Sequence, residues 1–162
     1  MPRESDRSAR PYLSPLTKSN EGDVIIKGAN ALDASRGQTA ILIGDPQGGT
    51  IVHALHAVLG RRIRLLLPVG LEKRVHGDLH ELAGVLNLPG VQGPRLLPVP
   101  GEVVTEIEAL KMLTGAQAHL VAAGGVCGAE GAVWLAVTGS AEELRETEKI
   151  MAAVSEEPPF SL

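Results

Sequence analysis

Aromatic residues are almost absent from this chain of 162 residues, in which Tyr, Trp and Phe occur once each. A surface that binds single-stranded nucleic acid needs several aromatic rings on which bases stack, so this composition argues against one. The formal net charge of −4 also argues against a protein that neutralises a phosphate backbone. We therefore expect no nucleic-acid partner.

Cysteine and long apolar runs are also scarce. Cys127 stands alone, so it forms no internal disulfide or thiolate zinc site, and one cysteine fits a reducing compartment. The longest uncharged stretch, residues 112–129, is interrupted by glycines and by Gln117 and His119, unlike a membrane span of about 20 apolar residues. The first 20 residues hold no apolar segment of the secretory type. We expect a cytoplasmic protein with no membrane partner.

The chain has the composition of a globular protein, with 44% hydrophobic residues. Its sequence predicts four parts along the chain. These are a polar tail over residues 1–20, an α/β ligand-binding part over 21–94, a ferredoxin-like subdomain over 95–154 and an irregular tail over 155–162.

The ligand-binding part predicts an α/β fold with a mostly parallel sheet covered by helices. Its apolar runs are continuous, as in strands that are covered on both faces, and a helix separates the second run from the third. Thr50 is the predicted N-cap of that helix and Gly60 its C-terminal glycine. The expected strands are 23–27, 38–43 and 62–67, the helices are 51–59 and 72–86, and residues 28–33 are a loop.

The last third predicts a ferredoxin-like β-α-β-β-α order. Ser140 and Glu143 have the spacing of a capping box at the start of its final helix. The expected strands are 95–99, 118–123 and 133–137, and the expected helices are 102–113 and 141–154.

Two glycine-containing turns follow apolar strands, and the second of them opens a helix. Ligands of open α/β sheets bind at the carboxyl ends of strands, and backbone N–H groups at a helix N-terminus attract anions. Glycine lets a ligand approach the backbone, although many such turns bind nothing. Neither a P-loop nor a dinucleotide fingerprint is present. The predicted ligand-binding residues are Lys27, Gly28, Asn30, Asp33, Gly48, Gly49, Thr50 and Lys73.

Candidates for acid–base catalysis are fewer. His53 and His56 lie three residues apart on the predicted helix, and imidazole titrates near neutrality. Glu102 is a third candidate if the fold brings it to the same pocket. His76 and His80 have a spacing that suits zinc, but they are also simply polar-face residues. We predict no metal site and no cofactor.

Four short segments occur in the order found in a known family. Lys27-Gly28-Ala29-Asn30, Gly48-Gly49-Thr50, Glu72-Lys73 and the segment 98–103 resemble the ribose-5-phosphate isomerase branch of the NagB/RpiA/CoA-transferase-like superfamily. The resemblance extends over about residues 23–154 and implies that family's fold and pocket. Lys27 and Asn30 replace two carboxylates of the family's loop, and Leu55 replaces its helix acid. The resemblance therefore implies a bound ligand rather than the isomerase reaction.

Three functions follow as hypotheses. The first is a self-associating domain that binds a small anionic metabolite, phosphorylated or carboxylated. The second is an isomerase or transferase that acts on a sugar phosphate or related acid. The third is a non-catalytic oligomeric scaffold, because the stretch 116–129 is apolar and poor in charge, which favours a homo-oligomer.

Overall fold

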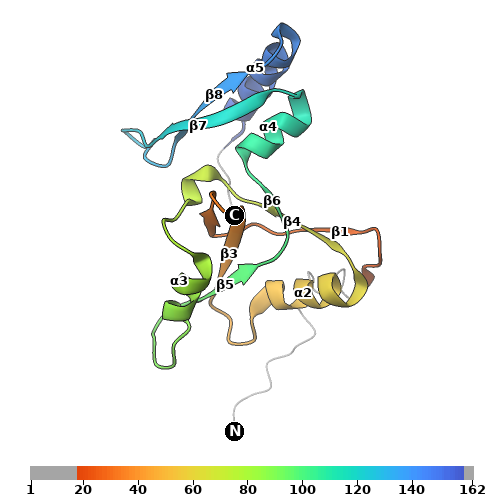
Figure 1. Cartoon of the computed structure of the whole chain (residues 1–162), viewed down its shortest axis with the longest axis vertical. Coiled ribbons are helices and arrows are strands. Elements are labelled where there is room, and N and C mark those ends of the chain that lie inside the picture. The colour runs from red at the N-terminus through yellow and green to blue at the C-terminus, as the bar shows by residue number, and fades with distance from the viewer. Residues whose placement is uncertain (1–17, 159–162) are drawn as a thin grey trace. The chain divides into compact units, whose positions relative to one another are not determined.

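The computed structural model of the chain describes residues 18–158 (Figure 1). The chain divides into two compact units, which we treat separately. Within the described residues, the first unit comprises 18–69 and 73–103, and the second comprises 70–72 and 104–158. Most of the predicted N-terminal tail and the last four residues of the C-terminal tail lie outside the described residues.

The first unit contains a sheet with the strand order β1-β4-β6. Strand β1 (Val24–Ile26) is parallel to β4 (Arg64–Pro68), and β6 (Glu102–Val104) is the other neighbour of β4. Helix α2 (Gly49–Arg61) precedes β4 and buries one apolar side chain on each of three successive turns, those of Ile51, Ala54 and Ala57. The predicted α/β fold class is confirmed, and the first and third predicted strands are parallel to each other.

A second sheet in this unit is antiparallel. Strand β3 (Gln38–Ile43) lies between β2 (Ala31–Asp33) and β5 (Arg95–Val99) and is antiparallel to both. Helix α3 (Leu79–Leu86) packs on this sheet around a core of Ala31, Ala40, Leu79, Ala83 and Leu96. The Asn87 amide at the end of α3 donates to the Leu96 carbonyl and accepts from the Leu96 N–H, which ties the helix to β5.

Strand β3 does not join the mostly parallel sheet that the sequence predicts. The reason is the unexpected strand β2: residues 31–33, predicted as a loop, form a strand whose side chains are all buried. A short turn then returns the chain antiparallel to β2, so β3 pairs with β2 and β5 instead of β1. Ala and Asp are both depleted in strands, which explains why β2 lacks a strand signal.

The region 72–86, predicted as one helix, divides into two elements. A 3₁₀ turn, η1 (Leu71–Lys73), is followed by main chain that pairs with β2 before α3 begins. The Val75 N–H donates to the Leu32 carbonyl at 3.0 Å. Since this pairing uses backbone groups that a helix would need, the helix starts only at Leu79, where Asp78 caps it.

The second unit contains a hairpin between two helices. Strands β7 (Gln117–Ala123) and β8 (Val133–Thr138) are antiparallel, and helices α4 (Glu106–Thr114) and α5 (Ala141–Ser155) flank them in the chain. Along β8 the side chains alternate between half-buried and exposed, as expected of a strand with one covered face. The predicted helix–strand–strand–helix order is therefore present.

Two details of this unit differ from the expectation. Helix α4 starts four residues later than predicted because Thr105 is its N-cap, with Glu108 completing a capping box, and residues 102–104 form β6. Strand β5, expected to begin the ferredoxin-like order, pairs with β3 in the first unit. The predicted capping box of Ser140 and Glu143 is confirmed at the start of α5.

Within residues 18–158, no helix has both the length and the apolar character that crossing a bilayer requires.

Candidate functional site

The first turn of α2 carries no side-chain cap. Its N-cap residue is Gly48, at φ 84°, and no acidic residue lies in the first turn. The first N–H groups of a helix have no partner inside the helix, so they need an acceptor from outside it. Thr50, predicted as the N-cap, lies inside the helix, and Gly60 is not its end, because the helix runs on to Arg61 and is closed by Arg62 in the left-handed region. Both of these capping predictions were wrong.

Two features of the structure at position 48 favour glycine. Its φ of 84° lies in the left-handed region, and a Cβ on Gly48 would collide with the Val52 side chain one turn into α2. The neighbouring Gly49 also has a positive φ, of 62°. Gly48 and Gly49 both have left-handed backbone, and they present main chain without side chains to the space in front of the helix.

A pocket of about 140 Å³ opens at this turn. Five of the predicted ligand-binding residues line it: Lys27, Asn30, Gly48, Gly49 and Thr50. The remaining lining comes from residues 41–45 and Ile51. The structure thus brings together segments from the end of β1, the approach to β2, the end of β3 and the start of α2.

Backbone pairing positions Lys27 and Asn30. The Lys27 N–H donates to the Leu66 carbonyl, which continues the parallel pairing of β1 with β4 by one residue. The Asn30 N–H donates to the Ala40 carbonyl, and the Asn30 side-chain oxygen accepts from the Leu42 N–H at 3.0 Å. The Asn30 side chain therefore keeps its NH₂ group as a donor, and the half-buried Lys27 adds a positive charge.

The loop before α2 is fixed by Arg95 and by its own turn. The Arg95 guanidinium donates to the carbonyl of Asp45 at 2.8 Å, and the Gly48 N–H donates to the same carbonyl at 2.9 Å. The Asp45 carboxylate accepts from the Gln47 N–H and also lines the pocket. The site therefore holds one negative charge besides the positive charge of Lys27.

Three predicted ligand-binding residues are not among those lining this pocket. Gly28 is exposed in the loop after β1, and its carbonyl accepts from the Lys27 ammonium at 3.4 Å. The Lys73 ammonium donates to the Ala29 carbonyl at 3.1 Å. Asp33 lies at the far end of β2, where it belongs to a different group of polar side chains.

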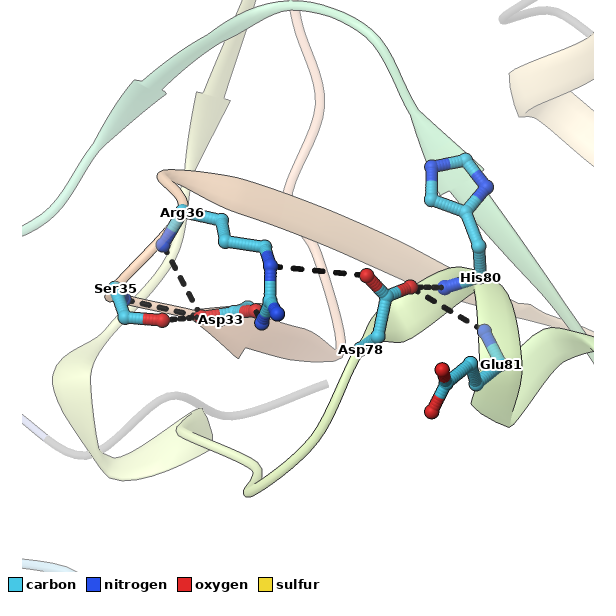
Figure 2. Close-up of polar contacts among 6 residues, drawn as sticks. All are labelled: Asp33, Ser35, Arg36, Asp78, His80 and Glu81. Carbon is cyan, nitrogen blue, oxygen red and sulfur yellow. Dashed lines mark hydrogen bonds and ion pairs between the residues drawn. The ribbon is translucent and has the colours of Figure 1, made fainter.

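The Asp33 group closes the turn between β2 and β3 (Figure 2). The Asp33 carboxylate accepts from the Ser35 hydroxyl at 2.6 Å and from the Arg36 guanidinium at 2.7 Å, and the Arg36 Nε lies 3.7 Å from Asp78. The hydrogen bond from Ser35, followed by that from Arg36, lowers the pKa of Asp33 to about 2. Asp78 in turn accepts from the backbone N–H groups of His80 and Glu81.

This group lies along a larger cavity, of about 440 Å³. Sequence reasoning placed Asp33 in the glycine pocket and assigned no role to the other charged residues here, Arg36, Arg74, Asp78 and Glu81. The available signal was Asp78 followed three residues later by Glu81, the pattern of a capped helix start, which would have located α3.

The catalytic candidates do not assemble at the glycine pocket. His53 and His56 are exposed on α2 with ring centres 6.4 Å apart, and neither lines the pocket. The Glu102 carboxylate accepts two hydrogen bonds from Arg64, at 2.8 and 2.6 Å, and these lower the pKa of Glu102. Within residues 18–158, no three His, Cys, Asp or Glu side chains converge as a metal site would require.

The structure therefore shows a small glycine-lined pocket with a cation, an amide donor and one carboxylate, that of Asp45, among the residues that line it. Comparison of the chain with models of known families, with curated proteins and with solved structures finds no match.

Proposed function

We propose that this protein binds a small anionic metabolite, phosphorylated or carboxylated, in the glycine pocket at the start of α2. The observation that carries the proposal is that the uncapped first turn of α2 and the Lys27 side chain line the same pocket. Orphan N–H groups and the positive end of the helix favour a negative charge there. A nearby ammonium adds a charge-assisted contact.

The size of the pocket limits what it holds. A volume of about 140 Å³ suits a phosphate or carboxylate group, with the rest of the ligand extending outward. Asn30 offers an amide donor and Asp45 an acceptor, which suits hydroxyl groups next to the anionic group. The resemblance to the ribose-5-phosphate isomerase branch, whose segments include Lys27–Asn30 and Gly48–Thr50, supports a sugar phosphate as the ligand. We place the protein in the cytoplasm, where such metabolites and a lone reduced cysteine are expected.

The site favours binding over catalysis. Proton transfer in an isomerase requires a base within hydrogen-bonding reach of the substrate. Asp45 is the one carboxylate among the residues lining the pocket, and His53, His56 and Glu102 lie outside the lining. The isomerase or transferase hypothesis would require Asp45 to act as that base.

The proposal is tested by titrating ¹⁵N-labelled protein with inorganic phosphate, acetate and ribose 5-phosphate at constant ionic strength. We expect saturable shifts of the amide signals of Gly48, Gly49, Thr50 and Ile51 with at least one of these anions. Lys27→Ala should weaken that binding about tenfold, or about 1.4 kcal/mol, because it removes a charged contact. Asp45→Asn should tighten it several-fold, because it removes a like charge.

The matched control is Lys111→Ala, which removes an exposed lysine on α4 of the second unit. It should leave the affinity unchanged. If none of the three anions shifts the α2 amides, or if Lys27→Ala binds as tightly as the wild type, the proposal is wrong.

A second candidate function, the oligomeric scaffold, is favoured by a separate observation. The second unit has an apolar cleft of about 400 Å³ between α4, β8 and α5. Its lining is apolar apart from one carboxylate and consists of Glu106, Ala109, Leu110, Leu113, Val133, Leu135, Val137, Ile150, Met151 and Val154. A cleft of this kind in a unit with a two-stranded sheet is what self-association would cover.

A further inference from the structure

The larger polar cavity of the first unit is a second place where a small molecule fits. Its volume of about 440 Å³ lies within the range of known small-molecule pockets, roughly 300 to 1,000 Å³. One wall is the turn from Asp33 to Arg36, and the other is the segment from Arg74 to Asp78 with the first turn of α3. Both walls are held by hydrogen bonds, so the cavity is formed before any ligand arrives.

Each wall has its own anchor. The Leu32–Arg74 bridge and the hydrogen bond from the Val75 N–H to the Leu32 carbonyl fix the second wall to β2. The Arg36 guanidinium joins the two walls, since it contacts Asp33 at 2.7 Å and Asp78 at 3.7 Å (Figure 2). The charges of Asp33, Arg36 and Asp78 are thus paired with one another.

Arg74 and Glu81 line the same cavity, and neither side chain forms a hydrogen bond or ion pair of this kind, although the Glu81 charge acts on Arg36 through space. The Arg74 side chain is half-buried and forms no hydrogen bond or ion pair with any residue in the range 18–158. The carboxylate of Glu81, in the first turn of α3, likewise has no hydrogen bond or ion pair in the described part of the chain, and these two side chains do not pair with each other.

A partly buried guanidinium without a carboxylate loses hydration and gains no contact in return. It is also the side chain best suited to a planar carboxylate, which it binds through two parallel hydrogen bonds. Glu81 presents the opposite charge and accepts hydrogen bonds from an ammonium group. The exposed apolar surface of Val75, at 38%, lies in the same lining and suits a short apolar side chain on the ligand.

We propose that this cavity binds a small zwitterion of the α-amino acid class, with its carboxylate on Arg74 and its ammonium on Glu81. The lining as a whole favours a ligand with both charges. With histidine counted as neutral, the lining carries three negative charges, on Asp33, Asp78 and Glu81, against two positive charges, on Arg36 and Arg74, so a purely anionic ligand meets net repulsion. This site is separate from the glycine pocket, because the two linings share no residue.

The experiment titrates ¹⁵N-labelled full-length protein with each standard L-α-amino acid in turn. We expect saturable shifts of the amide signals of Ser35, Arg36 and residues 74–81 with at least one of them. The amine that lacks its carboxylate and the acid that lacks its amine should each bind at least tenfold more weakly. Absence of a saturable shift with every amino acid, or equal binding of the acid alone, would overturn the proposal.

Two variants assign the charges. Arg74→Gln and Glu81→Gln should each weaken binding of the selected amino acid at least tenfold, because each removes one of the two charged contacts. The matched controls are Arg145→Gln and Glu142→Gln, which remove exposed charges from α5 of the second unit and should bind as the wild type does. Unchanged affinity in either Arg74→Gln or Glu81→Gln, with circular dichroism confirming the fold, contradicts the assignment.

The readout also separates this proposal from the one for the glycine pocket. The selected amino acid should move the signals of residues 74–81, and the anion that binds the glycine pocket should move those of Gly48–Ile51 and leave residues 74–81 in place. Amino acids that shift only the α2 amides would overturn the proposed zwitterion site and leave the anion site standing.

Discussion

The carboxylate of Asp33 organises the connection between β2 and β3. It is 4% exposed and accepts from the N–H groups of Ser35 and Arg36 as well as from both of their side chains. A buried carboxylate is tolerable only when its acceptor sites are used in this way. Because the same turn decides that β3 runs antiparallel to β2, Asp33 influences the sheet as well as its own loop.

This arrangement makes stability depend on pH in a defined direction. The pKa of Asp33 is about 2 in the folded protein against an ordinary value of 3.8, because Ser35 and then Arg36 donate hydrogen bonds to the charged form. A lowered pKa means that the contribution is complete above pH 3.8 and is lost as the pH falls toward 2. Asp33→Asn should therefore lower the melting temperature at neutral pH, and the difference from the wild type should shrink in acid.

Thermal unfolding followed by circular dichroism between about pH 7 and pH 2 measures this difference. Glu21→Gln is the control, because the Glu21 side chain is exposed and its charge forms no ion pair within the described residues. It should melt close to the wild type throughout. A difference between wild type and Asp33→Asn that stays constant down to pH 2 would contradict the assigned role.

The sequence predicted part of the glycine pocket because the signal there is local. Lys27 and Asn30 flank a turn after an apolar strand, and Gly48 to Thr50 follow another, so each segment is recognisable alone. That the two turns meet in one pocket is now shown by their shared lining. Asp33 and Lys73 have equally suitable chemistry, but their positions depend on hydrogen bonds to Ser35, Arg36 and Ala29 that spacing does not reveal.

At the scale of the element, the predictions succeeded where local chemistry decides the structure. Strand 38–43 and strand 95–99 have the predicted bounds, and the capping box of Ser140 and Glu143 starts α5 as expected. The prediction of one helix over residues 72–86 was wrong, because Arg74 and Val75 pair with strand β2 and this pairing overrides their helical pattern. Strand β2 was missed for a related reason, since its pairing with β3 outweighs the low strand propensity of Ala31 and Asp33.

The capping box gives the clearest prediction at this scale. The Ser140 hydroxyl accepts from the Glu143 N–H, and the Glu143 carboxylate accepts from the Ser140 N–H at 2.6 Å. The bond from Ser140 lowers the pKa of Glu143. Ser140→Ala should destabilise the second unit by about 1 kcal/mol, because the first turn of α5 loses an acceptor. Urea unfolding followed by helical circular dichroism measures the change.

The control lies at the other end of the same helix. The Ser155 hydroxyl donates to the Ala152 carbonyl at the C-terminus of α5 and caps no N–H group. Ser155→Ala should change the free energy of unfolding by less than about 0.5 kcal/mol, as exposed substitutions usually do. Equal effects of the two substitutions would show that capping does not stabilise α5.

At the scale of the whole molecule, strand order is where sequence and structure differ most. Strand β5 was expected to lie beside the β7–β8 hairpin, but it pairs with β3 over five residues in the first unit. The predicted and the observed sheets both contain this strand, because an apolar run predicts a strand but not the neighbour with which the strand pairs. The consequence is that β7 and β8 pair only with each other in the described part of the chain, and no further strand covers their edges.

A unit built on such a hairpin has more apolar surface than its helices cover. A two-stranded sheet is marginal in water unless helices or further strands cover its apolar face. In this unit the half-buried side chains of Val133, Leu135 and Val137 face the cleft that α4 and α5 leave open. The exposed side chains of Met151 and Val154 enlarge that apolar surface. These features make the second unit the expected site of the self-association that we propose.

The last prediction concerns that association. If two copies cover the cleft, a charge at its rim should dissociate them, because a carboxylate would be buried without a partner. Met151→Glu should therefore elute as a monomer in size-exclusion chromatography with light scattering, where the wild type has a higher mass. Met112→Glu is the matched control, since Met112 is 67% exposed on α4 and does not line the cleft, so it should keep the wild-type mass. A monomeric wild type, or dissociation by both substitutions alike, would mean that the cleft is not the interface and would leave ligand binding by the first unit as the remaining proposal.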